Sequence, residues 1–185
     1  MENGVFLETK RLMLKVLHES DASKVLDYYL RNKNFLADWE PVRGEEFYTL
    51  TYQQSQITNE LNLISEGRLF KVWILEKGNN SLIGSIALNN IVRGSFQSCH
   101  LGYKLDESKI NKGYMTEALE KVIEYAFEEL QLHRIEANII PHNIRSLSVV
   151  EKLGFYNEGL AIRYLIINGR WEDHIHMVLR NEAME

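Results

Sequence analysis

The part of the sequence best suited to chemistry is a junction between an apolar segment, residues 101–105, and a helical pattern that starts at Tyr114. Between them, Asn111, Lys112 and Gly113 belong to a polar turn that contains glycine. Backbone N–H groups converge where a strand passes through such a turn into a helix, and the helix dipole favours negative charge there. Because Lys112 adds a positive charge, the junction indicates a site for a phosphate or pyrophosphate. An ordinary loop-to-helix turn with a solvated lysine has the same pattern.

A second junction lies between the next apolar segment and its helix, at residues 141–146. Asn143 is a natural N-cap, because its side-chain oxygen can accept a hydrogen bond from the first helical turn. Ser146 falls at the third helical position. It is either a simple first-turn serine or a hydroxyl at the mouth of the same cleft as the first junction.

Other patterns of reactive residues are weak. The first junction lacks the spacing of a Walker A loop and of a Gly-x-Gly-x-x-Gly dinucleotide fingerprint. His174 and His176 lie two residues apart without a cysteine or carboxylate at ligand spacing, so we expect no metal site. Cys99 is the single cysteine and sits in an apolar segment, so we expect it to be inert packing rather than a nucleophile.

The periodicity of apolar residues predicts the elements that position these junctions. Strict alternation predicts strands and a 3.6-residue period predicts helices, whereas residues 34–48 are predicted to be irregular. The predicted strands are 11–17, 69–75, 82–90, 96–105, 134–140 and two that flank the turn at 168–169. The predicted helices are one that begins at Ser20 or Asp21, one that ends near Glu66, and those over 114–130 and 143–153. This order indicates an α+β fold, with an antiparallel meander leading into a β-α-β unit.

Length and composition bound the class of protein. The 185 residues have the size of one domain, predicted to span 1–185, and 45% of them are hydrophobic and 25% charged, as in globular proteins. No stretch reaches the ~18 apolar residues of a membrane span, and residues 1–4 show no start of a secretory signal. The formal charge of −5 argues against nonspecific nucleic-acid binding and mildly favours a cationic substrate. A single cysteine fits a reducing, cytoplasmic location.

Beyond these patterns, the sequence resembles a known family. Residues 101–118 and 143–155, the latter ending in Glu-Lys-Leu-Gly-Phe, are similar to the acyl-CoA site of the GNAT superfamily of N-acetyltransferases. Four further stretches, 35–43, 90–96, 133–138 and 168–174, resemble the bacterial ribosomal-protein-alanine N-acetyltransferases of the RimJ type. Within them, Trp-Glu-Pro-Val-Arg and Val-Arg-Gly-Ser-Phe are specific, whereas Glu-Lys-Leu-Gly-Phe is common to many relatives.

The resemblance implies a GNAT fold, in which helices flank a mixed, mostly antiparallel sheet and two central strands splay apart in a V. Acetyl-CoA would lie in that V, with its pantetheine arm along one strand and its pyrophosphate on the loop before the long helix. Asn143 would bind the pantetheine arm. The cofactor-binding residues implied in this way are Leu101, Gly102, Tyr103, Lys104, Leu105, Asn111, Lys112, Gly113, Tyr114, Met115, Thr116 and Asn143.

The implied reaction is direct transfer of acetyl from acetyl-CoA to a primary amine within a ternary complex. Backbone N–H groups near residues 101–103 would polarise the thioester carbonyl, and Ser146 would protonate the leaving thiolate. His100 stands where relatives often carry glutamate. It is either a general base, because histidine titrates near neutrality, or a histidine that only lines the cleft. Asn111 replaces a glycine of the family's phosphate loop, and we expect binding to survive because asparagine tolerates left-handed backbone.

The implied acceptor is the N-terminal α-amino group of a protein, and of a ribosomal protein by the RimJ-type likeness. Trp39, Glu40 and Trp171 are predicted to bind it, with Glu45 and Glu46 nearby to suit an ammonium group followed by basic residues. Trp39 could instead pack in the core, with the glutamates in a solvated loop. Two other functions stay open: acetylation of a small amine (a polyamine, aminoglycoside or amino acid) and acyl-CoA binding without turnover. We expect no nucleic-acid, membrane or metal partner, and either a monomer or a homodimer.

Overall fold

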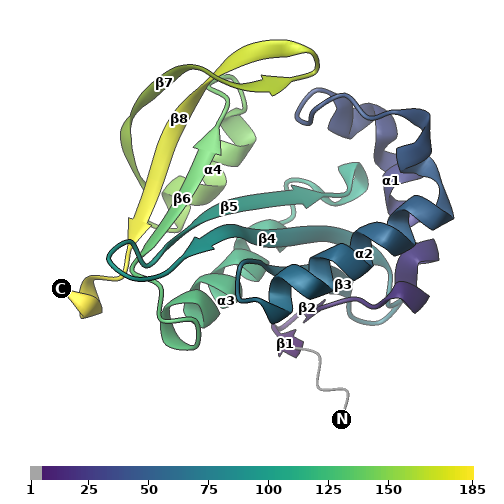
Figure 1. Cartoon of the computed structure of the whole chain (residues 1–185), viewed down its shortest axis with the longest axis horizontal. Helices are drawn as coiled ribbons and strands as arrows, with labels where there is room; N and C mark the ends of the chain where they lie inside the picture. Colours follow the sequence, from purple (N-terminus) through teal and green to yellow (C-terminus); the bar gives the residue numbers. More distant parts are fainter. Residues whose placement is uncertain (1–5) are drawn as a thin grey trace.

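The computed structural model describes residues 6–185, in which helices cover one sheet of eight strands (Figure 1). Within residues 6–185 the strand order is β1-β2-β3-β4-β5-β6-β8-β7, and only the β5–β6 pair is parallel. The strands are β1 (Phe6–Glu8), β2 (Leu12–Lys15), β3 (Phe70–Glu76), β4 (Leu82–Val92), β5 (Ser98–Leu105), β6 (Arg134–Ile139), β7 (Tyr156–Ile167) and β8 (Arg170–Arg180). The α-helices are α1 (Ala22–Ala37), α2 (Leu50–Ser65), α3 (Tyr114–Glu128) and α4 (Ile144–Lys152). The expected α+β class is confirmed.

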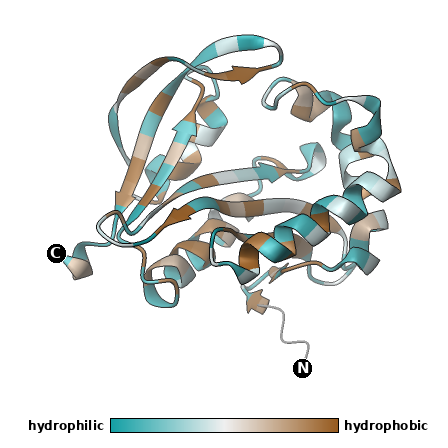
Figure 2. Cartoon of the chain, viewed as in Figure 1, coloured by the Kyte–Doolittle hydropathy of each residue, from teal (hydrophilic) through white to brown (hydrophobic). Residues whose placement is uncertain are grey.

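Alternation along the strands builds a core on each face of the sheet, and the alternation along β6 is visible in Figure 2. In β3, Val72 and Ile74 join a core with α3 and α4, whereas Trp73 and Leu75 join a core with α1 and α2. Helix α3 packs because its apolar residues recur at helical spacing on one face. The buried residues of that face are Met115, Ala118, Leu119, Val122 and Ala126. Helices α1 and α2 therefore cover one face of the sheet and α3 and α4 the other.

The central strands β5 and β6 diverge, as the family resemblance implies. They pair only where residues 98–100 of β5 meet residues 134–136 of β6. Beyond that point, residues 101–105 still pair with β4 but have no partner strand on their other side among residues 6–185. Figure 1 shows the resulting wedge between the two strands. This edge of β5 keeps backbone donors and acceptors available to a ligand.

The structure differs from the predicted secondary structure at the end of α1 and at β1. Helix α1 runs to Ala37, into the segment expected to be irregular, because Asn32 and Leu36 continue its buried stripe. Strand β1 was not predicted, since three residues are too short to show a period. None of the helices within residues 6–185 has the length and apolar character that crossing a membrane takes. The expectation about a secretory signal concerns residues 1–4, which lie outside the described residues.

Candidate active site

Helix α3 begins at a loop whose geometry suits an anion. Its N-cap, Gly113, has a left-handed backbone with φ of 75°, and Asn111 is also left-handed with φ of 59°. The first bond inside the helix runs from the Glu117 N–H to the Gly113 carbonyl, at 3.1 Å. In the described part of the chain, no side chain caps the N–H groups of residues 114–116. These groups and the helix dipole can therefore attract an anion.

Arg11 holds this loop and neutralises the carboxylate at the start of the helix. Its Nη1 donates to the Lys112 carbonyl (2.9 Å), while its Nε and backbone N–H donate to Glu117 (2.6 and 2.8 Å). Burial alone would raise the pKa of Glu117, but hydrogen bonds from Thr9 and Arg11 outweigh it and lower that pKa. Glu117 is therefore a paired carboxylate. Sequence reasoning missed Arg11, which lies 101 residues before Lys112.

A cavity of about 530 Å³ opens at this loop, between the free edge of β5 and the start of α4; we call it the α4 cavity. Apolar side chains of Ile110 and Val149 and the cations Arg145 and Lys152 contribute to its wall. The residues predicted for the cofactor or its sulfur that line it are Tyr103, Lys104, Leu105, Asn111, Gly113, Tyr114, Met115, Thr116, Asn143 and Ser146. The two junctions identified in the sequence thus border one cavity.

Two neighbours hold Ser146 in the α4 cavity. Asn143 caps α4, and its Oδ1 accepts a hydrogen bond from the Ser146 N–H at 3.2 Å. Tyr103 reaches across the cleft from β5, and its hydroxyl lies 2.6 Å from Ser146 Oγ and 3.0 Å from the Ser146 carbonyl oxygen. Burial raises the pKa of Tyr103 to about 12, so the phenol keeps its proton at neutral pH.

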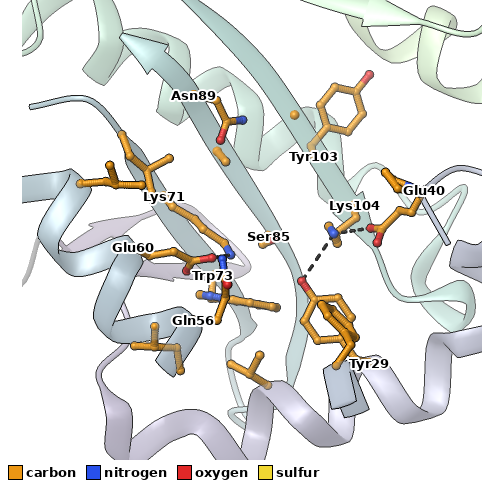
Figure 3. A pocket seen from close by; sticks show the side chains of 18 of the residues that line it. Tyr29, Glu40, Gln56, Glu60, Lys71, Trp73, Ser85, Asn89, Tyr103 and Lys104 are labelled. Atoms are coloured by element: carbon orange, nitrogen blue, oxygen red, sulfur yellow. Dashed lines mark hydrogen bonds and ion pairs between the residues drawn. The ribbon is translucent and has the colours of Figure 1, made fainter. Parts of the chain in front are cut away.

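A second cavity, of about 840 Å³, lies on the other face of the sheet beside α2; we call it the α2 cavity (Figure 3). Its floor is open because small residues face it from the strands. Ala87 of β4 pairs with Gly102 of β5, and Ser85 pairs with Lys104 in the next row. Aromatic residues of its wall include Tyr29, Phe47 and Trp73. The volume of the cavity is in the range of sites that bind organic molecules rather than a small ion.

Ion pairs stand on opposite walls of the α2 cavity (Figure 3). Lys71 of β3 pairs with Glu60 of α2 at 2.5 Å, and Lys104 of β5 pairs with Glu40 from the segment after α1. Burial alone would lower the pKa of Lys104, but Tyr29 and Glu40 outweigh it and raise that pKa. Lys104 therefore stays charged.

The two cavities meet at a wall that they share. Trp39, Glu40, Tyr103 and Lys104 line both. The Glu40 carbonyl also accepts a hydrogen bond from the Asn168 N–H at 3.1 Å, which joins the segment after α1 to the β7–β8 turn (Figure 1). A molecule in each cavity would approach the other at Tyr103 and Lys104, beside the free edge of β5.

A match to a family model decides the relationship to known proteins. Residues 11–156, most of the chain, match the model described as an acetyltransferase (GNAT) domain. The chain belongs to the GNAT acetyltransferase family. It is 39% identical over 171 residues to the ribosomal protein uS5-alanine N-acetyltransferase of Escherichia coli (strain K12), which covers 92% of this chain and 88% of that protein.

Solved structures of GNAT relatives have the same fold. The ribosomal-protein-S5-alanine acetyltransferase of Vibrio fischeri superposes with a TM-score of 0.93 at 35% identity, over 98% of this chain and 99% of that one. RimJ of Mycobacterium smegmatis, in complex with CoA-disulfide, superposes with a TM-score of 0.88 at 29% identity, over 94% and 83% of the two chains. The expected GNAT fold with splayed central strands is confirmed.

Four residues that the sequence suggested for the GNAT site line neither cavity. Leu101 of β5 is buried in the core, and the Lys112 ammonium donates to the Ser108 carbonyl at 2.8 Å.

Trp171 of β8 is 61% exposed on the β7–β8 hairpin, and residues 165–167 of β7 line the α2 cavity in its place. The register of β7 and β8 shifts between residues 161 and 165, and such a bulge changes which side chains face inward. The fourth residue is His100.

The acidic residues expected near the acceptor also lie elsewhere. Glu45 is 94% exposed and pairs with Lys33 at 3.7 Å, and neither Glu45 nor Glu46 lines a cavity. Of the three carboxylates expected near the acceptor, Glu40 therefore lines the α2 cavity, whereas Glu45 and Glu46 do not. Cys99 is buried, and burial raises its pKa to about 12, in keeping with a packing role. His174 is buried too, with Nδ1 3.0 Å from the Glu172 carbonyl.

His100 lies at the rim of the α2 cavity. Its Nδ1 is 3.3 Å from Nδ2 of Asn90, which lines the cavity, and its Nε2 is 3.7 Å from Glu136. Because His100 itself does not line either cavity, we expect His100→Gln to lower kcat less than ~10-fold, well below the ~10²–10⁴ typical of a general base. Rates should be measured across pH 6–9, with His133→Gln as the control. A loss of ~100-fold with a changed acid limb would make His100 the base.

Proposed function

We propose that this chain transfers acetyl from acetyl-CoA to the N-terminal α-amino group of a protein. The observation that carries the proposal is the meeting of two cavities at Tyr103 and Lys104, beside the free edge of β5. The α4 cavity reaches the loop before α3, which suits an anion. The α2 cavity lies on the opposite face of the sheet, over small residues of β4 and β5. Such an arrangement lets donor and acceptor meet directly within one ternary complex.

The α4 cavity suits coenzyme A, which combines a pyrophosphate, an arm with amide groups and a thiol. The N–H groups of residues 114–116 suit the pyrophosphate. The unpaired edge of residues 101–105 offers the hydrogen bonds that an amide-containing arm needs. Arg145 and Lys152 bring positive charge to the same cavity, and Ile110 and Val149 bring apolar surface. The residues present therefore fit the coenzyme.

The residues at the junction of the cavities can assist acetyl transfer. Bound acetyl-CoA would supply an acetyl thioester, whose C–S bond breaks with its electron pair leaving on sulfur as the amine nitrogen forms the new C–N bond. Backbone N–H groups of residues 101–103 would donate to the thioester oxygen as negative charge develops, which typically contributes ~3–4 kcal/mol. Ser146 would donate a hydrogen bond to the sulfur as negative charge develops there, and water would supply the proton of the product thiol. Buried Cys99 takes no part.

The acceptor amine must be neutral to attack, and this requirement favours an α-amino group. An α-amino group has a pKa of ~8 and is neutral in roughly one molecule in ten at pH 7. A lysine side chain, with a pKa of ~10.4, is neutral in fewer than ~one in a thousand. Water would suffice to take the proton from an α-amino group.

The charges of the α2 cavity favour an acceptor with one ammonium group. Among residues 6–185, the carboxylates that line it are Glu40 and Glu60, and each is paired with a lysine. Arg43 and Arg68 line the cavity as well. A polyamine would bring several ammonium groups to a cavity whose carboxylates are already paired. A peptide N-terminus brings one ammonium group and an otherwise uncharged backbone.

The named relatives support the same class of acceptor. By their names, the Escherichia coli and Vibrio fischeri proteins acetylate an alanine of a ribosomal protein. At 39% and 35% identity over nearly the full chain, these proteins make a protein N-terminus the best-supported acceptor class for this chain as well.

We expect peptides that begin with Ala, Ser or Thr to be acetylated at the α-amino group, and spermidine and aminoglycosides to be acetylated at least ~10-fold more slowly. The reason is the paired state of Glu40 and Glu60. The measurement is incubation with acetyl-CoA followed by mass spectrometry. The matched controls are the same peptides with a blocked N-terminus and an internal lysine.

Two outcomes would contradict the proposal in different ways. Faster acetylation of a polyamine or aminoglycoside than of every peptide would make the chain a small-amine acetyltransferase. Binding of acetyl-CoA without thiol release across both panels would make it an acyl-CoA-binding module.

A further inference from the structure

Tyr103 and Ser146 share two hydroxyl hydrogens across the cleft between β5 and α4. The Tyr103 hydroxyl lies 2.6 Å from Ser146 Oγ and 3.0 Å from the Ser146 carbonyl oxygen. A phenol has one hydrogen to donate. If Tyr103 donates to the carbonyl, the short contact to Oγ requires that Ser146 donate to Tyr103. If Tyr103 donates to Oγ, the serine hydrogen is released to a third acceptor in the α4 cavity.

We propose that Tyr103 is a positioning residue that releases the Ser146 hydrogen toward the sulfur of bound coenzyme A. The inference rests on the proposed function. In the active arrangement Tyr103 donates to Ser146 Oγ, and Ser146 donates to sulfur. Two donors in series polarise each other, so the second hydrogen bond is stronger than that of an isolated serine.

The pair acts by hydrogen bonding and not by net proton transfer. Burial raises the pKa of Tyr103 to about 12, whereas a thiol ionises near ~8.5, so moving the phenol proton to a thiolate is uphill. Both hydroxyls therefore keep their hydrogens. The amine nitrogen loses its proton to water, and the sulfur later takes a proton from water, which balances the reaction.

Binding of coenzyme A with its free thiol tests the pair without catalysis. If the two hydroxyls stabilise the thiolate, wild-type affinity for coenzyme A rises with pH through the thiol's titration range and levels off above ~8.5. We expect this rise to be about 10-fold smaller in Tyr103→Phe and Ser146→Ala. Calorimetry from pH 7 to pH 10 measures it.

Two controls isolate the thiol. Acetyl-CoA carries no ionisable thiol, so its affinity reports the other titratable and charged groups of the cavity. These groups are Glu40, Lys104, Tyr114, Arg145 and Lys152.

The second control, Tyr125→Phe, removes a phenol from α3, where the ring stacks on Phe70 with centroids 4.6 Å apart. This variant should bind coenzyme A like wild type. Equal pH profiles for coenzyme A and acetyl-CoA in the wild type would overturn the proposal.

Kinetics give an independent test. Tyr103→Phe should lower kcat about 10-fold with little change in the KM for acetyl-CoA, and should cause no further loss in a Ser146→Ala background. The same fold loss in both backgrounds would show that Tyr103 acts without Ser146 and would overturn the inference. A pH-dependent rise in the affinity for coenzyme A, without acetylation of any amine, would refute the proposed function. It would still support stabilisation of the thiolate by the Tyr103 and Ser146 hydroxyls.

Discussion

Replacing Gly113 with proline is expected to abolish acetyl-CoA binding, with at least a ~100-fold loss of affinity. Gly113 has φ of 75°, which proline, fixed near −65°, cannot adopt. The turn would have to rearrange, and the N–H groups of residues 114–116 would no longer converge on one point. Each hydrogen bond to a charged group contributes ~1.5–3 kcal/mol, so loss of two of them is sufficient. Calorimetry on the folded variant measures the affinity.

The matched control is Gly78→Pro, in the turn between β3 and β4. Gly78 is also left-handed, with φ of 98°, and it lines neither cavity. The same strain is therefore introduced away from the loop at residues 111–113, and thermal melting shows that each variant folds. Wild-type affinity in a folded Gly113→Pro protein would rule out this loop as the pyrophosphate site.

Ser146→Ala is expected to lower kcat by ~10²–10³ while the affinity for acetyl-CoA changes less than ~2-fold. The hydroxyl would act on the sulfur only as negative charge develops there, so its loss affects the transition state more than binding. The backbone N–H of Ser146 would still donate to Asn143, so α4 keeps its cap. Steady-state kinetics with a saturating peptide, together with calorimetry, separate the two quantities.

Ser146→Thr is the matched variant, because it keeps a hydroxyl at the same carbon. Partial recovery of kcat in Ser146→Thr is expected, and it would assign the loss to the hydroxyl and not to a cavity left by the mutation. A fully active Ser146→Ala enzyme would reduce Ser146 to a residue of the first helical turn with no part in the reaction.

Most elements of this fold could be predicted from the sequence, because their patterns are local. Helix α3 and strands β3 and β4 have periods and turn residues within a few positions. Both site junctions were found for the same reason, since an N-cap and a glycine turn act within one helical turn. Strand β1 was missed because three residues are too short to show a period, and the end of α1 because its buried stripe continues through a polar residue, Asn32.

The sequence by itself determined the glycine turn before α3, the capped serine helix and, through its resemblance, the GNAT family. Only the tertiary structure decided which side chains meet across the splay. Tyr103 contacts Ser146 from 43 residues away, and Glu40 contacts Lys104 from 64 residues away. The tertiary structure also placed residues 165–167, and not Trp171, along the α2 cavity. The physical reason is that such contacts depend on strand register, bulges and twist, which the whole sheet determines and which no short window of residues encodes.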